Sequence, residues 1–266
     1  MIVVKNIIRT IVSSFILIGC AGRPPAPVDN FERGSQQIRH NSSNSTQRPP
    51  LPGKRQKSGN PVNPRTIEKL PSISSSTVTL TGQEIFKKCN SAVFMVFTST
   101  GYQGFQGSGF FISPDGLAVS NYHVFKGTGI GWETIKLSDG KEYKLEKVLF
   151  KDEANDVIIF TIKNPAGSKF NYIPLSSRVP QVGDKAYAIG SPRGLENTFS
   201  SGEISQFRNG NLIQISVPID HGSSGGALIN EYGEAIGITS AGLDDSGANL
   251  NFAVNINVVR QRIGQL

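Results

Sequence analysis

Short apolar runs separated by turn sequences fill the chain from residue 92 to residue 239, and this pattern constrains the fold most. Turn sequences such as Ser113-Pro114-Asp115-Gly116 and Asn230-Glu231-Tyr232-Gly233 lie between the runs, and their residue types favour tight turns. Many short strands at this spacing indicate an all-β sandwich or barrel. The expected strands are 92–98, 109–112, 117–120, 135–137, 157–162, 186–189, 212–217, 226–229 and 235–239.

Two short helices are expected to flank these strands. Thr81-Gly82-Gln83-Glu84 is a capping-box sequence, in which Thr81 caps a helix that continues through Lys88. A second helix is expected at residues 258–265. Cys89, which follows the first helix, is interpreted as a small core residue because free cysteines are commonly buried.

The basic charge of the chain is concentrated in its N-terminal part. The whole chain has a net charge of +7, but residues 1–71 hold 11 of the 27 Lys and Arg and 3 of the 20 acidic residues. The remainder therefore has a net charge of −1. Because a nucleic-acid-binding face needs clustered Lys and Arg on the folded domain, we expect no nucleic-acid partner.

The N-terminus resembles a bacterial lipoprotein signal. Lys5 and Arg9 precede a short apolar run, 11–18, that ends in Leu17-Ile18-Gly19-Cys20. This run is too short to span a bilayer. We expect lipidation at Cys20, with an uncleaved anchor or an ordinary signal peptide as the alternatives. Cys89 would then have no partner for an intrachain disulfide.

Three segments follow from this interpretation. Residues 1–19 are expected to be the lipoprotein signal peptide. Residues 20–80, rich in Pro, Ser and Arg, are expected to be a disordered tether, since they bury too little apolar surface to offset their conformational entropy. Residues 81–266 are expected to form the folded domain.

Three stretches of the domain carry side chains suited to nucleophilic catalysis. His123 follows one expected strand, Asp156 opens another, and Ser224 lies on the glycine-rich turn His221-Gly222-Ser223-Ser224-Gly225-Gly226. A serine hydroxyl needs a base to take its proton, and histidine has a suitable pKa near neutrality. The histidine in turn needs an acceptor on its other ring nitrogen. Gly222 and Ser224 are placed so that their N–H groups could stabilise an oxyanion.

These stretches resemble chymotrypsin-fold serine proteases, and most closely the HtrA/DegP branch. The resemblance covers residues 81–259 and is carried by the order of four motifs: Gly107-Ser108-Gly109-Phe110-Phe111-Ile112, Asn121-Tyr122-His123-Val124, Asp156 before an apolar strand, and Gly222-Ser223-Ser224-Gly225-Gly226-Ala227-Leu228. It implies two six-stranded Greek-key β-barrels with the active site between them. It also implies a catalytic triad of His123, Asp156 and Ser224, and an oxyanion hole of Gly222 and Ser224.

Two departures from the family pattern limit what it implies. HtrA proteins usually continue into a PDZ domain, whereas this sequence ends at Leu266, so peptide sensing through a PDZ domain is not implied. Trypsin-like zymogens carry Asp immediately before the nucleophile, and here that position is Ser223. Activation by N-terminal cleavage is therefore not expected.

Alternatives exist for each site residue. Asp152 and Asp220 compete with Asp156, Ser223 competes with Ser224, and His221 lies beside the nucleophile. The alignment of the motifs with those of the family favours His123, Asp156 and Ser224. No Cys/His cluster has metal spacing, so we expect no metal and no cofactor. A lipase of the α/β-hydrolase type needs its Ser before its His, which is the reverse of the order here.

The expected function is a serine endopeptidase of the cell envelope that cleaves unfolded or extended proteins. The resemblance implies a substrate pocket built by Pro218, Ile219, His221, Ser240 and Ala241, which offers no counter-charge to Lys or Arg. The alternative is a catalytically idle protease fold that acts as a binding or chaperone-like module. Lipidation at Cys20 followed by Ala21 suggests a membrane partner, namely the outer membrane on its periplasmic face. The sequence leaves the oligomeric state open.

Overall fold

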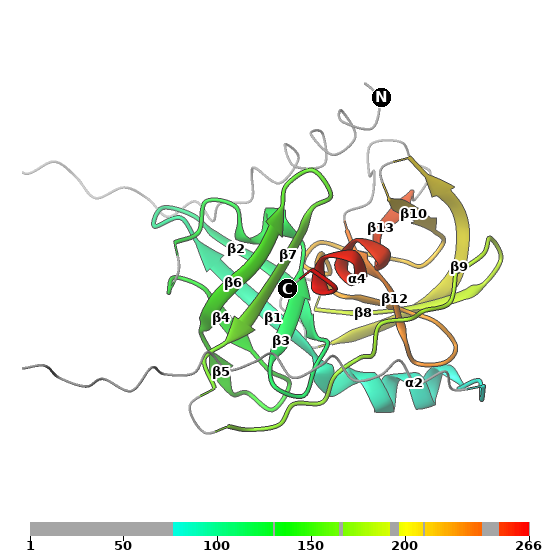
Figure 1. Cartoon of the computed structure of the whole chain (residues 1–266), viewed down its shortest axis with the longest axis horizontal. Coiled ribbons are helices and arrows are strands. Elements are labelled where there is room, and N and C mark those ends of the chain that lie inside the picture. Colours follow the sequence, from blue (N-terminus) through cyan, green and yellow to red (C-terminus); the bar gives the residue numbers. More distant parts are fainter. Residues whose placement is uncertain are drawn as a thin grey trace, which may run out of the picture. The chain divides into compact units, whose positions relative to one another are not determined.

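Two antiparallel β-sheets form the framework of the domain (Figure 1). The computed structural model describes residues 77–129, 131–164, 167–191, 197–209, 211–240 and 250–265. In chain order the elements are α2 (Gly82–Cys89), the 3₁₀ turn η1 (Asn90–Ala92), β1 (Val93–Ser99), β2 (Gly104–Phe111), β3 (Leu117–Ser120), α3 (Tyr122–Phe125), β4 (Thr134–Lys136), β5 (Glu142–Tyr143), β6 (Leu145–Asp152), β7 (Val157–Ile162), β8 (Lys185–Gly190), β9 (Thr198–Arg208), β10 (Leu212–Ile215), β11 (Ala227–Ile229), β12 (Ala235–Thr239), β13 (Asn251–Asn255) and α4 (Asn257–Ile263).

The first sheet is a strongly curled, open sheet of seven strands in the order β5-β4-β1-β2-β3-β7-β6. Strands β1 to β3 are consecutive neighbours and β4 returns to lie beside β1, which is the Greek-key arrangement. The prediction of a closed six-stranded barrel is therefore wrong for this half of the domain. The two edge strands, β5 and β6, are separated in the chain only by Lys144.

A buried carboxylate lies beside the start of β6. Glu133 is 1% exposed, and its carboxylate accepts the N–H groups of Leu145 at 2.9 Å and Gly131 at 2.7 Å. The first N–H of β6 is thus bonded to a side chain and not to a strand. Strand β5 is short and pairs with β4, and the sheet is open between β5 and β6.

The second sheet is a closed barrel of six strands in the order β10-β13-β12-β11-β8-β9. The prediction of a six-stranded barrel is confirmed here, and β11 lies beside β8 in the same Greek-key pattern. The eleven-residue β9 pairs with β8 along one part and with β10 along another. This long strand is strongly curved (Figure 1).

The two sheets have different interiors. The first is filled by aromatic rings: Phe94 lies 4.7 Å from Phe111 and 6.5 Å from Phe160 between ring centroids, and Phe125 lies 5.2 Å from Phe160. The second is filled by aliphatic side chains, several of them alanines. Small side chains suit the narrow interior of a closed six-stranded barrel.

A third apolar cluster lies between the sheets and includes both flanking helices. Thr81 caps α2 as predicted, and the hydrogen bonds from its backbone and side chain lower the pKa of Glu84. Val259 of α4 is fully buried in the cluster. Cys89 is also buried there, as predicted, and burial raises the pKa of its thiol to about 11.

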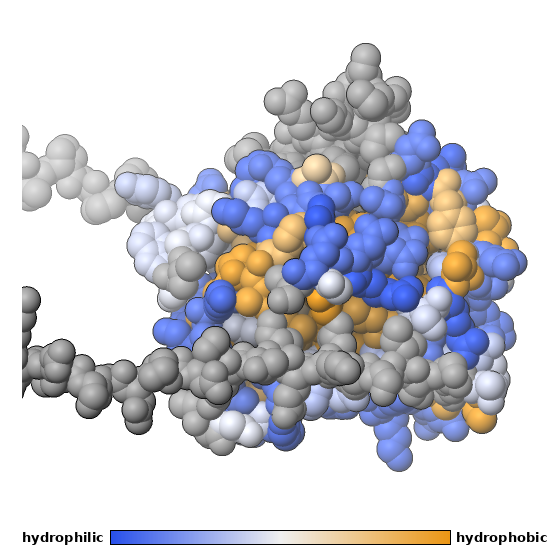
Figure 2. Space-filling view, in the orientation of Figure 1, coloured by the Kyte–Doolittle hydropathy of each residue, from blue (hydrophilic) through white to orange (hydrophobic). Residues whose placement is uncertain are grey.

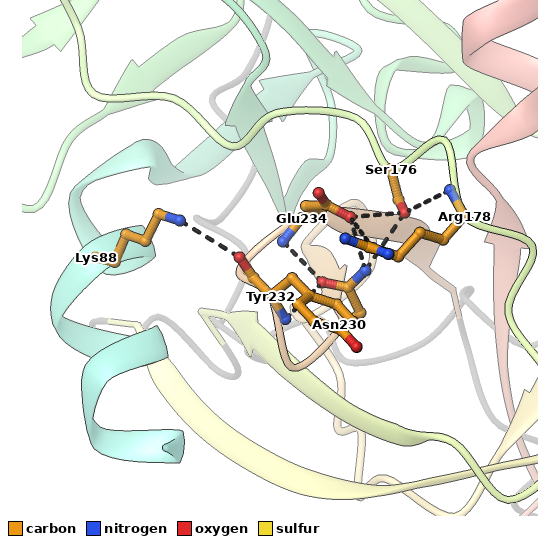
Figure 3. Close-up of polar contacts among 6 residues, drawn as sticks. All are labelled: Lys88, Ser176, Arg178, Asn230, Tyr232 and Glu234. Atoms are coloured by element: carbon orange, nitrogen blue, oxygen red, sulfur yellow. Dashed lines mark hydrogen bonds and ion pairs between the residues drawn. The ribbon is translucent and has the colours of Figure 1, made fainter. Parts of the chain in front are cut away.

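A polar cluster fixes the segment that connects the two sheets (Figure 3). The buried carboxylate of Glu234 accepts hydrogen bonds from Ser176 Oγ at 2.9 Å and Asn230 Nδ2 at 3.0 Å, and it lies 3.5 Å from Arg178 Nε. The Arg178 guanidinium stacks 4.0 Å from the ring centre of Tyr232. These contacts hold the connecting segment against the turn between β11 and β12.

The outer surface is mixed in character. On the face shown in Figure 2, hydrophilic residues surround and interrupt the hydrophobic ones. Among the residues described, no helix has the length and apolar character needed to cross a membrane.

Candidate active site

His123 and Asp156 are brought together by two neighbouring strands of the first sheet. His123 lies on α3, directly after β3, and Asp156 lies directly before β7. Because β3 pairs with β7 and Ser120 is opposite Ile158, the end of one strand lies beside the start of the other. His123 Nδ1 is 2.7 Å from Asp156 Oδ2, and the His123 backbone N–H donates to Oδ1 at 2.8 Å.

The backbone at Asp156 is held in an unusual conformation. Its φ of 55° lies in the left-handed region, which few residues other than Gly, Asn and Asp adopt. The Asp156 carbonyl accepts a hydrogen bond from Nδ2 of Asn121, which is fully buried. Strained backbone of this kind persists where the surroundings fix it, and it clusters at functional sites.

The competing acids have other partners. The Asp152 carboxylate accepts the N–H groups of Ala154 and Asn155 at 3.0 and 3.1 Å, together with the side-chain amide of Asn155. It therefore stabilises the turn between β6 and β7. The Asp220 carboxylate accepts the His221 N–H at 2.7 Å. The Asp156 carboxylate, by contrast, lies 2.7 Å from Nδ1 of the His123 ring.

Ser224 lies on a double turn between β10 and β11. The Ser223 N–H donates to the Asp220 carbonyl at 3.0 Å, and the Gly226 N–H donates to the Ser223 carbonyl at 2.9 Å. The third residue of each turn is a glycine with positive φ, 92° at Gly222 and 90° at Gly225. This is the pattern of two successive type II turns, which require a residue able to adopt positive φ at that position. The glycine spacing around the serine therefore has a direct conformational cause.

The serine turn and the helix that carries His123 both pack against Gly107 of β2. A Cβ atom on Gly107 would lie 2.7 Å from both methyl carbons of Val124, the neighbour of His123, and 3.1 Å from the Ser224 carbonyl oxygen. The Ser224 carbonyl also accepts the Ser108 N–H at 2.8 Å. The absence of a side chain at Gly107 thus lets the elements that carry His123 and Ser224 approach each other.

Backbone hydrogen bonds within the double turn leave two N–H groups available. Those of Ser223 and Gly226 are used inside the turn, and the Gly225 N–H donates to the Thr239 carbonyl at 2.8 Å. The N–H groups of Gly222 and Ser224 donate to no acceptor among the residues that the structure describes. These are the two groups that the sequence predicts for an oxyanion hole.

The expected pocket residues are only partly described. Pro218 and His221 are exposed, Ile219 is half-buried against the interior of the second barrel, and Ser240 is buried. Ala241 and the lipidation candidate Cys20 lie outside the described residues. Across the described ranges, no three His, Cys, Asp or Glu side chains are grouped as a metal site would require.

Sequence reasoning missed three residues that support the site. Asn121 holds the Asp156 backbone, Ser108 contacts the serine turn, and Thr239 Oγ1 donates to the Ser223 carbonyl at 2.6 Å. Asn121 and Ser108 belong to two of the four family motifs, so the sequence indicated that they lie near the site. It did not indicate their hydrogen bonds, because the partners are 35 and 114 residues away.

Comparison with known proteins finds similarity to serine proteases. Residues 107–238 match the family described as "Trypsin-like peptidase domain". The chain is 38% identical over 171 residues to a probable serine protease do-like of Buchnera aphidicola, and 37% identical over 172 residues to the periplasmic serine endoprotease DegP of Escherichia coli. Each alignment covers 60% of this chain and 35% of the relative, so the chain matches about a third of the relatives' length.

A solved structure extends the likeness to the fold. The serine endoprotease from Yersinia pestis superposes with a TM-score of 0.63 and 25% identity, over 71% of this chain and 67% of that one. Residues 107–238 are therefore similar to a trypsin-like peptidase domain, and the chain is similar to DegP-like serine proteases over 60% of its length.

Proposed function

We propose that this chain is a serine endopeptidase with His123, Asp156 and Ser224 as its catalytic triad. The observation that carries the proposal is the 2.7 Å contact between His123 Nδ1 and Asp156 Oδ2, next to a serine turn with two available N–H groups. Asp156 would keep a proton on Nδ1, so that Nε2 is the basic nitrogen. Homology to serine proteases supports the same roles.

The proposed reaction proceeds through an acyl-enzyme. His123 Nε2 takes the proton of Ser224 as Oγ attacks the substrate carbonyl carbon. The carbonyl oxygen becomes an oxyanion, which the N–H groups of Gly222 and Ser224 stabilise. His123 then gives its proton to the leaving amine, and the peptide bond breaks. A water molecule attacks the remaining ester in the same way and releases the acid.

Substitutions of the neighbouring residues Ser224 and Ser223 test which serine is the nucleophile. Ser224→Ala should abolish proteolysis of casein, since loss of a triad member typically costs about 10⁴-fold or more in kcat. Ser223→Ala is the matched control and should keep most of the activity. A fluorophosphonate probe should label the native chain at Ser224. Wild-type turnover by Ser224→Ala, or an unlabelled native chain, would favour the idle binding module instead.

The pocket is proposed to accept small or medium aliphatic side chains. Pro218 and Ile219 present no charge, and an unpaired cation buried against them would be costly. Ile219 also occupies room that a large aromatic side chain would need. We therefore expect cleavage after Val, Ala or Leu in extended segments, with a graded preference because one methylene is worth only about 1–3 kcal/mol. Mass spectrometry of casein digests tests this, and predominant cleavage after Lys or Arg would contradict it.

The proposed location is the cell envelope, with protein substrates and a lipid anchor at Cys20. The DegP relative of Escherichia coli is described as a periplasmic enzyme, which supports an envelope location. The apolar run that ends at Cys20 supports the anchor.

A further inference from the structure

Ser108 connects the first sheet to the serine turn of the second barrel. It lies on β2 and is fully buried. Its Oγ donates to the Gly222 carbonyl at 2.8 Å and accepts the Ser191 N–H at 2.9 Å. A backbone N–H can only donate and a carbonyl can only accept, so the direction of both bonds is fixed. The hydroxyl proton of Ser108 therefore points to Gly222.

The peptide between Gly222 and Ser223 is consequently held on both sides. Ser108 binds its carbonyl oxygen, and the Asp220 carbonyl accepts its N–H at 3.0 Å. A peptide group is planar, so these two bonds together fix its orientation. In the chain, this peptide group lies between the two peptide groups that carry the N–H donors of Gly222 and Ser224.

The next peptide is held by a second hydroxyl. Thr239 is 1% exposed, and its Oγ1 donates at 2.6 Å to the Ser223 carbonyl, which also accepts the Gly226 N–H. In a trans peptide the carbonyl and the N–H point in opposite directions. Thr239 therefore fixes the direction in which the Ser224 N–H points.

We propose that Ser108 and Thr239 are positioning residues that orient the two oxyanion donors from outside the turn. The inference rests on the proposed function, because it concerns how the Gly222 and Ser224 N–H groups meet the transition state. Neither hydroxyl touches the substrate. Each acts through the backbone of the turn, and one of them belongs to the opposite sheet, so the first sheet contributes to the oxyanion site of the second.

A role in positioning differs from a role in packing by its effect on kinetics. Hydrogen bonds to the oxyanion are stronger in the transition state than in the bound substrate, so misplaced donors lower kcat and leave KM almost unchanged. A peptidyl boronate forms a tetrahedral adduct with the serine and uses the same donors. Its affinity should therefore fall in parallel with kcat.

The test compares full-length wild type with Ser108→Ala, Thr239→Val and the control Ser176→Ala. Thr239→Val is nearly isosteric and should fold even if Ser108→Ala does not. Removal of one oxyanion donor costs about 10²–10³-fold in kcat, so misplacement should cost about 10–100-fold. We expect this loss in both variants, with KM within about two-fold and a matching loss of boronate affinity.

Ser176 provides the matched control because its hydroxyl is equally buried and donates at 2.9 Å to the Glu234 carboxylate, in the segment that connects the sheets. Ser176→Ala should lower the urea midpoint but keep kcat and boronate affinity. The inference is wrong if folded Ser108→Ala and Thr239→Val keep wild-type kcat, or if Ser176→Ala loses as much. A wild-type chain that neither hydrolyses peptides nor reacts at Ser224 would contradict the proposed function itself.

Discussion

Asp156 combines a strained backbone with a carboxylate that contacts His123 twice. Asn tolerates the left-handed region nearly as well as Asp does, so Asp156→Asn should keep the backbone at its φ of 55°. The amide would offer its N–H₂ group or its oxygen, and would no longer fix the proton on Nδ1. We expect a loss of about 10⁴-fold in kcat, measured with a chromogenic peptide near neutral pH.

Asp152→Asn is the control for this substitution. Asp152 stabilises the turn before Asp156, so its replacement should lower stability slightly and leave most of the activity. An inactive Asp152→Asn beside an active Asp156→Asn would mean that the wrong acid has been assigned. The position of Asp156 before an apolar strand allowed the sequence to predict it as the acid of the triad. The sequence could not indicate the strained φ or the contact with Asn121, since both depend on tertiary structure.

The elements that the sequence predicted well are the strands that are buried on both faces. The bounds of β3, β7 and β12 agree with the predicted runs because nearly every residue in them is apolar and buried. The long strand β9 was missed because its side chains are mostly polar and exposed. It is a strand because β8 and β10 provide backbone partners on both sides, which local composition cannot reveal.

The connection between the sheets depends on Glu234, and its replacement should destabilise the domain. Glu234→Ala leaves the buried hydroxyl of Ser176 without its acceptor, and leaves the buried Asn230 Nδ2 with only its 3.3 Å bond to Ser176 Oγ. A buried polar group that loses its partner costs about 1–3 kcal/mol. We expect a loss of that size in the free energy of unfolding, measured by urea denaturation with intrinsic fluorescence.

Glu153→Ala is the matched control because Glu153 also pairs with a cation, Lys126, but at the exposed surface. Exposed ion pairs contribute about 0–1 kcal/mol, so this variant should remain close to wild type. Equal unfolding midpoints for the two variants would show that the cluster of Figure 3 does not stabilise the connection.

At the scale of the whole molecule, the candidate site depends on the packing of one sheet against the other. His123 and Asp156 belong to the first sheet and Ser224 to the second, and Gly107 and Ser108 provide the contact between them. The order of the motifs predicted this division. The open form of the first sheet was not predictable, because it depends on which strands pair in the tertiary structure, and local sequence does not show this.

The proposed anchor makes a prediction for the full-length chain, which has only two cysteines, Cys20 and Cys89. If Cys20 carries a diacylglyceryl group, the protein should partition into the detergent phase and its mature N-terminal peptide should carry acyl-chain mass, since two chains give stable membrane attachment. Cys20→Ser should abolish both properties. Cys89→Ser should retain both, because Cys89 is a buried core residue. An N-terminal peptide without lipid in the wild-type protein would contradict the anchor.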